Sequence, residues 1–250
     1  MYTLKKSLGQ HFLKDESVCE RILAAIQQEK FSRLLEIGPG AGALTKYLMQ
    51  LEGVEFKTIE IDREKVDYLL KSYPLLQGKI SEGDFLDMDI PFAGEFMVTG
   101  NFPYNISSQI LFRILEWKNS VLGMVGMFQK EVAQRVASKE GNKVYGVTSV
   151  LVQAFFDVEY LFDVAPGSFQ PPPKVKSAVI KLRPRKNIPA MRSEPAFFLL
   201  VKTAFNQRRK TLRNAVRSLF DAAKLDNKLF DKRAEQLSVD ELAALTFSMK

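Results

Sequence analysis

The sequence predicts an α/β fold: a doubly wound, mostly parallel sheet with one antiparallel strand near its edge, followed by a small all-helical domain. Strand and helix patterns alternate as far as residue 156, the order that places crossover helices between parallel strands. Two further strand patterns, 158–164 and 177–182, have no helix between them and predict an antiparallel pair at the end of the sheet. From residue 194 onward the pattern is helical.

The apolar periodicity locates each element in turn. Strands are predicted at 33–37, 54–61, 79–82, 96–98 and 121–128. Helices are predicted after Asp15 and at 41–51, 64–72, 107–117, 130–137, 145–156, 194–206, 208–220 and 238–247. The basic, proline-containing segment 184–193 predicts a linker, so domains are expected at 1–183 and 194–250.

The composition is that of a globular protein. Of 250 residues, 46% are apolar and 26% charged, and the longest apolar run, Val121–Phe128, is far shorter than the roughly 18 residues of a membrane span. The amino end lacks the apolar stretch of a signal peptide, and Cys19, the only cysteine, excludes a disulfide within the chain. These features predict a cytoplasmic location.

The net charge of +7 is concentrated near the carboxyl end. From Lys181 onward there are 16 Lys and Arg against 7 Asp and Glu, which leaves 20 against 22 in the first 180 residues. A one-sided positive field favours a polyanion such as nucleic acid as partner, although such a surplus can also serve solubility alone.

One face of the predicted helix 208–220 carries part of this charge. Arg209, Arg213 and Arg217 recur at every fourth position, while the apolar residues face the other way. The residues predicted to meet phosphates are these three and their neighbours Lys202, Arg208 and Lys210. The alternative is a solvated surface stripe.

The stretch Val98–Asn105, VTGNFPYN, ends a buried strand abruptly, at the edge where open α/β sheets bind ligands. Asn101 can accept hydrogen bonds through its side-chain oxygen and Pro103 has no N–H, so this corner suits a substrate that donates from an amino group. Tyr104 and Phe102 offer flat faces for a planar ring, which favours an amine on a nucleobase. The alternative is an ordinary turn with aromatic core residues.

A glycine-rich turn follows the strand at 33–37. Gly38 and Gly40 let the backbone approach a ligand closely, and Glu60 lies 22 residues after Gly38, where an acid can grip a ribose diol. This layout predicts a cofactor that contains a nucleoside. It does not choose among such cofactors, because Gly38, Gly40 and Ala43 also fit the pattern of dinucleotide binders.

Three further residues each have two interpretations. Asp84 could accept from an adenine amino group, with Phe85 beside the ring, or could cap a loop. Phe169 precedes three prolines and could close over a flat substrate or plug the core beneath its loop. His11, the only histidine, could act at a site or form only local hydrogen bonds.

In combination, these motifs resemble those of the small-subunit rRNA adenine dimethyltransferases of the KsgA type, over essentially the whole chain. The segments that carry the likeness are LGQHFL (Leu8–Leu13), LEIGPGAGALT (Leu35–Thr45), IEID (Ile59–Asp62), GDFL (Gly83–Leu86), GNFPYNIS (Gly100–Ser107), MFQKEVAQRV (Met127–Val136), SFQPPPKVKSAV (Ser168–Val179) and AFNQRRKTLRN (Ala204–Asn214). Each segment is weak alone, whereas their order and spacing are specific.

The resemblance implies a Rossmann-like class I methyltransferase domain at 1–183 and an rRNA-binding domain at 194–250. It implies S-adenosylmethionine as cofactor and, as substrate, two adjacent adenines of a 3′-terminal small-subunit rRNA hairpin, each methylated twice on the 6-amino group. The cofactor contacts it implies are His11, Leu13, Gly38, Gly40, Glu60, Asp84, Phe85 and Asn101. Related members often have Asn where this chain has His11. A monomer that needs no metal is expected.

The implied chemistry is direct transfer of a methyl group from sulfonium to amine, which depends mainly on positioning. Asn101 and the carbonyl beside Phe102 and Pro103 would hold the two amine hydrogens. Tyr104 and Phe169 would sandwich the base, which has to leave its RNA stack to reach them.

Other functions share some of these features. A large-subunit rRNA adenine methyltransferase of antibiotic-resistance type has the same fold and chemistry, and a DNA adenine methyltransferase has the same chemistry. A ribosome-assembly factor would need the same basic surface, and the glycine pattern leaves a nicotinamide-dependent oxidoreductase open. The segments AFNQRRKTLRN and SFQPPPKV favour the small-subunit interpretation.

Overall fold

The computed structural model describes residues 11–250, so the predicted loop before His11, including Leu8–Gln10 of the first motif, lies outside the described residues. The chain divides into two compact units. The first consists of residues up to Ala133 together with Glu159–Pro184, and the second of Gln134–Val158 together with Arg185–Lys250. The functional roles given to 1–183 and 194–250 stay predictions.

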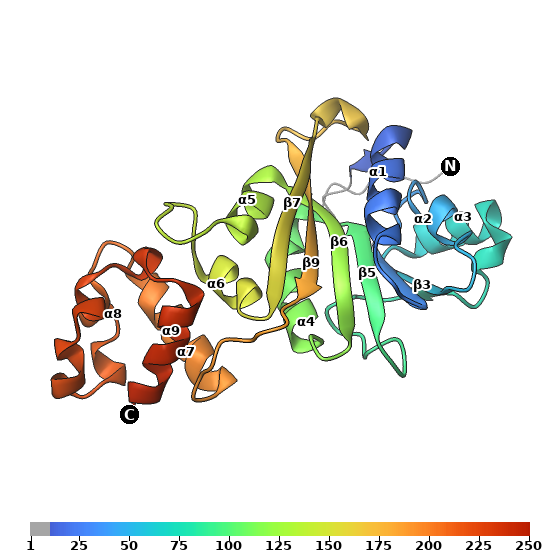
Figure 1. Cartoon of the computed structure of the whole chain (residues 1–250). Helices are drawn as coiled ribbons and strands as arrows, with labels where there is room; N and C mark the ends of the chain where they lie inside the picture. Colours follow the sequence, from blue (N-terminus) through green and yellow to red (C-terminus); the bar gives the residue numbers. More distant parts are fainter. Residues whose placement is uncertain (1–10) are drawn as a thin grey trace. The chain divides into compact units, whose positions relative to one another are not determined.

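Within residues 11–250, seven strands form one sheet in the order β4-β3-β2-β5-β6-β9-β7 (Figure 1). Their bounds are β2 (Arg33–Ile37), β3 (Glu55–Glu60), β4 (Ile80–Glu82), β5 (Phe96–Asn101), β6 (Val121–Gln129), β7 (Phe156–Val164) and β9 (Ser177–Pro184). Neighbours from β4 to β6 pair in parallel, and β9 runs antiparallel to β6. The predicted α/β fold with one antiparallel strand near the edge is confirmed.

The order of the strands reverses between β2 and β5. From β2 the chain adds β3 and β4 on one side and then returns to add β5 on the other. A crevice that can bind ligands opens outside the carboxyl ends of the strands at such a reversal. Ile37, Glu60 and Asn101, the last residues of β2, β3 and β5, therefore meet at this edge.

Helices cover both faces of the sheet in the first unit. They are α1 (Glu16–Gln27), α2 (Thr45–Leu48), α3 (Arg63–Ser72) and α4 (Ser107–Glu116). Leu34 and Met97, in register on β2 and β5, share a buried cluster with residues of α1, α2 and α3. Phe96 points to the opposite face, since side chains alternate along a strand. There its ring lies 6.0 Å from that of Trp117, just after α4.

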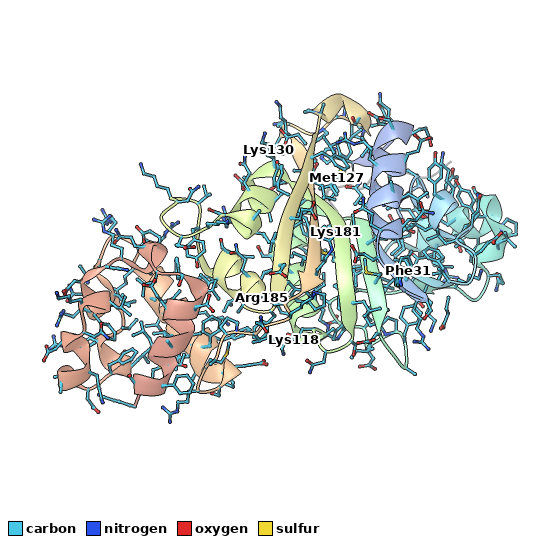
Figure 2. All side chains as sticks on the ribbon, viewed as in Figure 1. Phe31, Lys118, Met127, Lys130, Lys181 and Arg185 are labelled. Atoms are coloured by element: carbon cyan, nitrogen blue, oxygen red, sulfur yellow. The ribbon has the colours of Figure 1, made fainter. Side chains whose placement is uncertain are left out.

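A buried lysine joins α1 to the sheet. Lys181 on β9, labelled in Figure 2, donates to the carbonyl of Ala25 at 2.7 Å and to Gln28 Oε1 at 3.1 Å. Its ammonium also lies 2.5 Å from the carboxylate of Glu29. The last carbonyls of a helix lack partners within the helix and favour a cation, so Lys181 fixes the end of α1.

The amino-terminal segment is tied to the loop before β9. β1 (Phe12–Leu13) and β8 (Phe169–Gln170) form a two-stranded antiparallel sheet in which Leu13 pairs with Phe169. The Lys14 N–H donates to the Ser168 carbonyl at 2.9 Å. Strands of two residues have no detectable periodicity, so this pairing was not predicted.

The helix predicted at 41–51 is wrong at both ends, because α2 spans only Thr45–Leu48. Gly40 and Gly42 have φ angles of 59° and 85°, outside the right-handed helical region, so α2 begins only at Thr45. The helix predicted at 130–137 is confirmed as α5 (Lys130–Ala137).

The second unit is mainly helical. Its principal helices are α6 (Val147–Gln153), α7 (Glu194–Asn206), α8 (Leu212–Ala215) and α9 (Val239–Leu245). The single helix predicted at 208–220 is wrong, because Arg208 donates to the carbonyls of Lys143 and Tyr145 at 2.6 and 2.9 Å and holds a turn between α7 and α8. Thr211, before α8, is extended. Arg209, Arg213 and Arg217 therefore do not share one helical face.

Candidate active site

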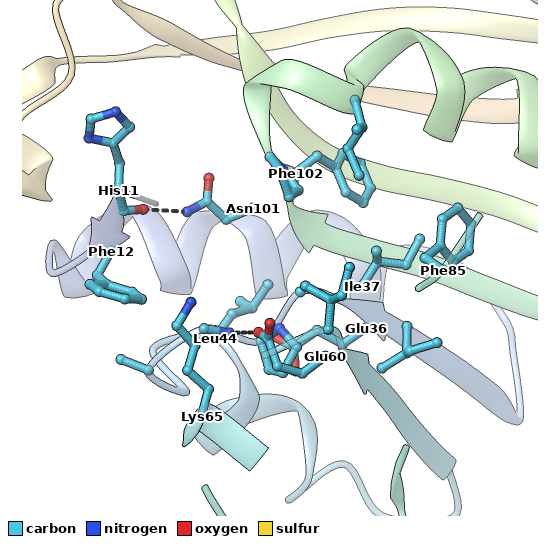
Figure 3. A pocket seen from close by; sticks show the side chains of 18 of the residues that line it. His11, Phe12, Glu36, Ile37, Leu44, Glu60, Lys65, Phe85, Asn101 and Phe102 are labelled. Atoms are coloured by element: carbon cyan, nitrogen blue, oxygen red, sulfur yellow. Dashed lines mark hydrogen bonds between the residues drawn. The ribbon is translucent and has the colours of Figure 1, made fainter. Parts of the chain in front are cut away.

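A cavity of about 250 Å³ lies at the carboxyl ends of β2, β3 and β5 (Figure 3). Its wall brings together most of the predicted site residues: His11, Leu13, Gly38, Gly40, Glu60, Asp84, Phe85, Asn101, Phe102, Pro103 and Tyr104. All of them belong to the first unit. Phe169 does not line this cavity.

The glycine turn after β2 forms one side of the cavity. The Gly38 N–H donates to the Ile59 carbonyl on β3 at 2.9 Å, which fixes where the turn begins. Gly40 has a left-handed φ of 59°, and a Cβ there would lie 3.2 Å from the ring of Phe12. Only glycine suits both the backbone angle and the close ring, so backbone forms the wall here.

Glu60 lies between the glycine turn and the start of α3. Its Oε2 accepts from the Gly40 N–H at 3.1 Å and its Oε1 from the Asp62 N–H at 3.0 Å. These bonds hold a nearly buried carboxylate in one orientation. Each oxygen has a further lone pair, which fits the hydroxyl groups of a ribose.

Glu36 on β2 also lines the cavity, although the sequence analysis did not select it. Its side chain is buried, and its Oε2 has no hydrogen-bond partner among the described residues. Burial raises the pKa of Glu36 to about 8, and the negative charge of Glu60 acts in the same direction. A buried acceptor without a donor in the cavity wall fits a ligand that carries N–H groups or positive charge.

The orientation of the Asn101 side chain follows from its neighbour. Its amide nitrogen donates to the backbone carbonyl of His11 at 3.0 Å. A carbonyl can only accept, so the atom facing it has to be nitrogen and the side-chain oxygen has to face the other way. Figure 3 shows that oxygen pointing away from His11. This orientation leaves the side-chain oxygen available to accept a hydrogen bond, and the predicted contact of Asn101 with an amine stays a prediction.

The aromatic ring of Phe102 belongs to the core. It lies 4.8 Å from the ring of Phe128, and a Cβ at Gly126 would be only 2.1 Å from it. Its exposed fraction is 1%, so the ring has no face for a base and Phe102 offers the cavity mainly its backbone. The next residue, Pro103, has no N–H, so this peptide group can only accept.

Tyr104 and His11 flank the cavity beside Asn101. The Tyr104 hydroxyl and the Ser177 hydroxyl are 2.6 Å apart, and burial raises the pKa of Tyr104 although the bond to Ser177 opposes this. The His11 ring is 5.6 Å from the Tyr104 ring, and its Nδ1 is 2.9 Å from the Pro171 carbonyl. Tyr104 is partly exposed, so of the predicted aromatic faces it fits a bound ring best.

Phe169 and Leu13 face each other inside the core. Phe169 is fully buried and belongs to the cluster that packs under α1, which matches the interpretation as a plug. Its contact with a base stays a prediction. In the described packing, the Phe169 ring has no exposed face that a base could stack on. Leu13 is 6% exposed and lines the cavity from β1.

Asp84 and Phe85 lie in the loop after β4. Asp84 Oδ1 accepts from the Leu86 N–H at 2.9 Å and therefore caps this loop, as its simpler interpretation predicts. The Phe85 ring packs edge-on against Trp117 at 5.3 Å. Both residues also line the cavity, so capping and a ligand contact are compatible.

The cavity wall also contains residues that were not predicted as site residues, among them Phe12, Glu36, Ile61 and Lys65. Ile61 directly follows Glu60 and is 51% exposed, unusual for a large aliphatic side chain and suited to a flat apolar ring. The position of Ile61 directly after Glu60 was the one feature of the sequence that could have placed it in the wall. No feature of the sequence placed Lys65 there, because its side chain reaches the cavity from within α3.

The six predicted RNA-binding residues, all in the second unit, differ in their surroundings. Arg208 is engaged with two backbone carbonyls, and Arg213 lies 2.8 Å from Asp231 and 3.7 Å from Asp226. The other four are exposed: Lys202, Arg209, Lys210 and Arg217. An RNA contact by any of the six stays a prediction.

Within residues 11–250, no helix is both long and apolar enough to cross a bilayer. The same residues contain no group of three or more His, Cys, Asp or Glu arranged to hold a metal ion.

The fold and the cavity together define the class of protein. A seven-stranded sheet with one antiparallel strand, whose switch point carries a glycine turn and an acid on the next strand, is typical of class I methyltransferases, which use S-adenosylmethionine. The wall fits that cofactor: Glu60 suits the ribose and Glu36 is a buried acceptor near the turn. The chain is an S-adenosylmethionine-dependent methyltransferase.

The model of the family "Ribosomal RNA adenine dimethylase" matches residues 1–248, and the chain belongs to this family. It is 52% identical to "Ribosomal RNA small subunit methyltransferase A" of Flavobacterium johnsoniae over 97% of this chain and 94% of that protein. The relative of the same name in Cytophaga hutchinsonii is 48% identical over 97% and 95%.

A solved structure agrees in fold. The dimethyladenosine transferase of Plasmodium falciparum superposes with a TM-score of 0.79 at 26% identity, over 93% of this chain and 94% of that one. The 23S rRNA methyltransferase ErmE has a TM-score of 0.69 at 24% identity and covers 93% and 99%, a likeness of fold alone.

Proposed function

We propose that the protein transfers methyl groups from S-adenosylmethionine to the 6-amino groups of two adjacent adenosines in a 3′-terminal hairpin of small-subunit rRNA, two methyls to each. The family and the names of the relatives support the substrate class. The observation that carries the chemistry is the amide of Asn101, whose oxygen is turned away from His11 by the bond at 3.0 Å.

The residues of the chain would position the amine. The bound cofactor supplies an electrophilic methyl group, so the protein has to present the nitrogen lone pair to it. Asn101 Oδ1 accepts one amine hydrogen, and the carbonyl of Phe102, which precedes the N–H-free Pro103, accepts the other. With both hydrogens held, the nitrogen becomes more tetrahedral, and its lone pair is localised on the nitrogen instead of delocalised into the ring, so that it can attack the methyl group.

Tyr104 would provide the face against which the base stacks. Stacking of a base on an aromatic side chain is worth about 1–3 kcal/mol, which offsets part of the cost of unstacking the adenine. The exposed residues Lys202, Arg209, Lys210 and Arg217 would hold the phosphates of the hairpin. A monomeric state and a cytoplasmic location belong to the same proposal.

The test is to incubate the purified protein with labelled S-adenosylmethionine and unmethylated small ribosomal subunits, and then to map the labelled nucleotides. Label on N6 of two adjacent adenosines near the 3′ end is expected. Large subunits and duplex DNA serve as comparison acceptors. Preferential labelling of either, or labelling of a different base, would overturn the proposed substrate.

A further inference from the structure

Lys65 is a buried cation in the wall of the cofactor cavity. It is the third residue of α3, its side chain is only 3% exposed, and it lines the cavity. Among the described residues that line this cavity, it is the only lysine or arginine. Figure 3 shows its amine directed from α3 toward Phe12 and the cavity.

Lys65 and Glu60 share neighbours on two sides. Its Nζ lies 5.0 Å from the centre of the Phe12 ring, and that ring is in contact range of Gly40. Gly40 in turn donates to one oxygen of Glu60. On its other side, Lys65 Nζ lies 3.9 Å from the carboxylate of Asp62, whose N–H donates to the second oxygen of Glu60.

The burial of Lys65 contrasts with the exposure of another cation on the same helix. Arg63, two residues earlier on the same helix, pairs with Asp67 and Glu82 while its side chain stays 70% exposed. Burying an ammonium carries a desolvation cost that a surface pair avoids. A group that lines a polar cavity can recover this cost when a ligand supplies further acceptors.

We propose that Lys65 is a cofactor-binding residue that donates to the ribose hydroxyl oxygens of the bound nucleoside, while Glu60 accepts from the same hydroxyls. A hydroxyl is both donor and acceptor, so a carboxylate alone leaves its acceptor lone pairs unused. A neighbouring ammonium can donate hydrogen bonds to these lone pairs. The inference rests on the proposed placement of the ribose at Glu60.

The experiment compares binding of S-adenosylhomocysteine with binding of its 2′-deoxy and 3′-deoxy forms by calorimetry, in the wild-type protein and in Lys65→Met. For the wild type, removing the contacted hydroxyl should weaken binding by about tenfold, the value of a hydrogen bond to a charged group. In Lys65→Met, S-adenosylhomocysteine itself should bind about tenfold more weakly, and removing the same hydroxyl should then have a smaller effect than in the wild type, because only its bond to Glu60 is left to lose.

Lys57→Met is the matched control. Lys57 lies over the Phe92 ring at 4.6 Å and donates to the Pro91 carbonyl, and it does not line the cavity. Its substitution should leave all three dissociation constants unchanged. If Lys65→Met fails to fold by circular dichroism, Lys65→Gln, which keeps a donor of similar length, takes its place and should show an intermediate loss.

The outcomes separate the two levels of the proposal. If neither deoxy form binds the wild type more weakly, the placement of the ribose at Glu60 is wrong and the role of Lys65 falls with it. If the wild type discriminates and the Lys65 variant discriminates equally, the ribose lies at Glu60 and the inference about Lys65 alone is overturned.

Discussion

The carboxylate of Glu60 accepts a hydrogen bond from the Gly40 N–H at 3.1 Å, so the acid at the end of β3 also fixes the turn after β2. Glu60 therefore shapes the backbone wall and, in the proposed function, also binds the ribose. Because one carboxylate does both, a substitution at Glu60 should weaken cofactor binding by more than the loss of a single hydrogen bond to the ligand.

The first prediction concerns this residue. Glu60→Gln should weaken binding of S-adenosylhomocysteine by at least about tenfold, since a neutral amide loses the charge-assisted bonds. Isothermal titration calorimetry measures this directly. Glu82→Gln is a suitable control, because Glu82 is the register partner of Glu60 on β4 and forms an exposed ion pair with Arg63. Equal affinities of the two variants would refute the role of Glu60.

The second prediction separates binding from transfer at Asn101. Asn101→Ala should lower kcat for methyl transfer to small subunits by about 100-fold or more, because the amine loses an acceptor that orients it. Binding of S-adenosylhomocysteine should survive at least in part in the same variant, with a much smaller loss than that in kcat. Turnover close to that of the wild type would show that another group orients the amine.

Much of the fold could be predicted because strong periodicity sets it. The strand Arg33–Ile37 agrees with its predicted limits, and the glycine turn, Glu60 and Asn101 meet because parallel strands end at the same edge. Lys65 and Glu36 could not be predicted as wall residues. Their places depend on how far a side chain reaches and what packs beside it, which periodicity does not record.

The prediction of a single helix at 208–220 failed for a related reason. The charges at Arg209, Arg213 and Arg217 recur at helical spacing, yet the Arg208 guanidinium binds two distant carbonyls and a turn forms instead. Tertiary hydrogen bonds overrode local propensity there. The burial of Phe169 also depends on a tertiary contact that local pattern does not record. Phe169 pairs with Leu13 in a sheet of two two-residue strands.

The third prediction concerns the turn between α7 and α8. Arg209→Glu together with Lys210→Glu should weaken binding to small subunits by about tenfold or more at moderate salt and should reduce the salt slope by about two ionic contacts. Both side chains are exposed, so the melting temperature should change little. Filter binding across a salt series is the measurement.

Arg213→Gln is the control for that turn. Its guanidinium already donates to Asp231 at 2.8 Å. Its loss should therefore lower the melting temperature and leave the salt slope of binding almost unchanged. If instead Arg213→Gln flattens the salt dependence and the Arg209 and Lys210 variant does not, the RNA-binding surface has been assigned to the wrong residues.

The last prediction concerns the buried carboxyl group of Glu36. Burial raises its pKa from an ordinary value of 4.5 to about 8. Between these two values the folded protein binds more protons than the unfolded chain, so the contribution of Glu36 to the free energy of unfolding falls as the pH rises from about 4.5 to about 8. Glu36→Gln removes this titration. From pH 5 to pH 9 the variant should gain roughly 4 kcal/mol relative to the wild type, with most of the gain complete by about pH 8, above which the two proteins should change in parallel. Urea unfolding of the cofactor-free protein from pH 5 to pH 9 measures the difference, and a constant offset between the two proteins across that range would mean that Glu36 does not titrate there.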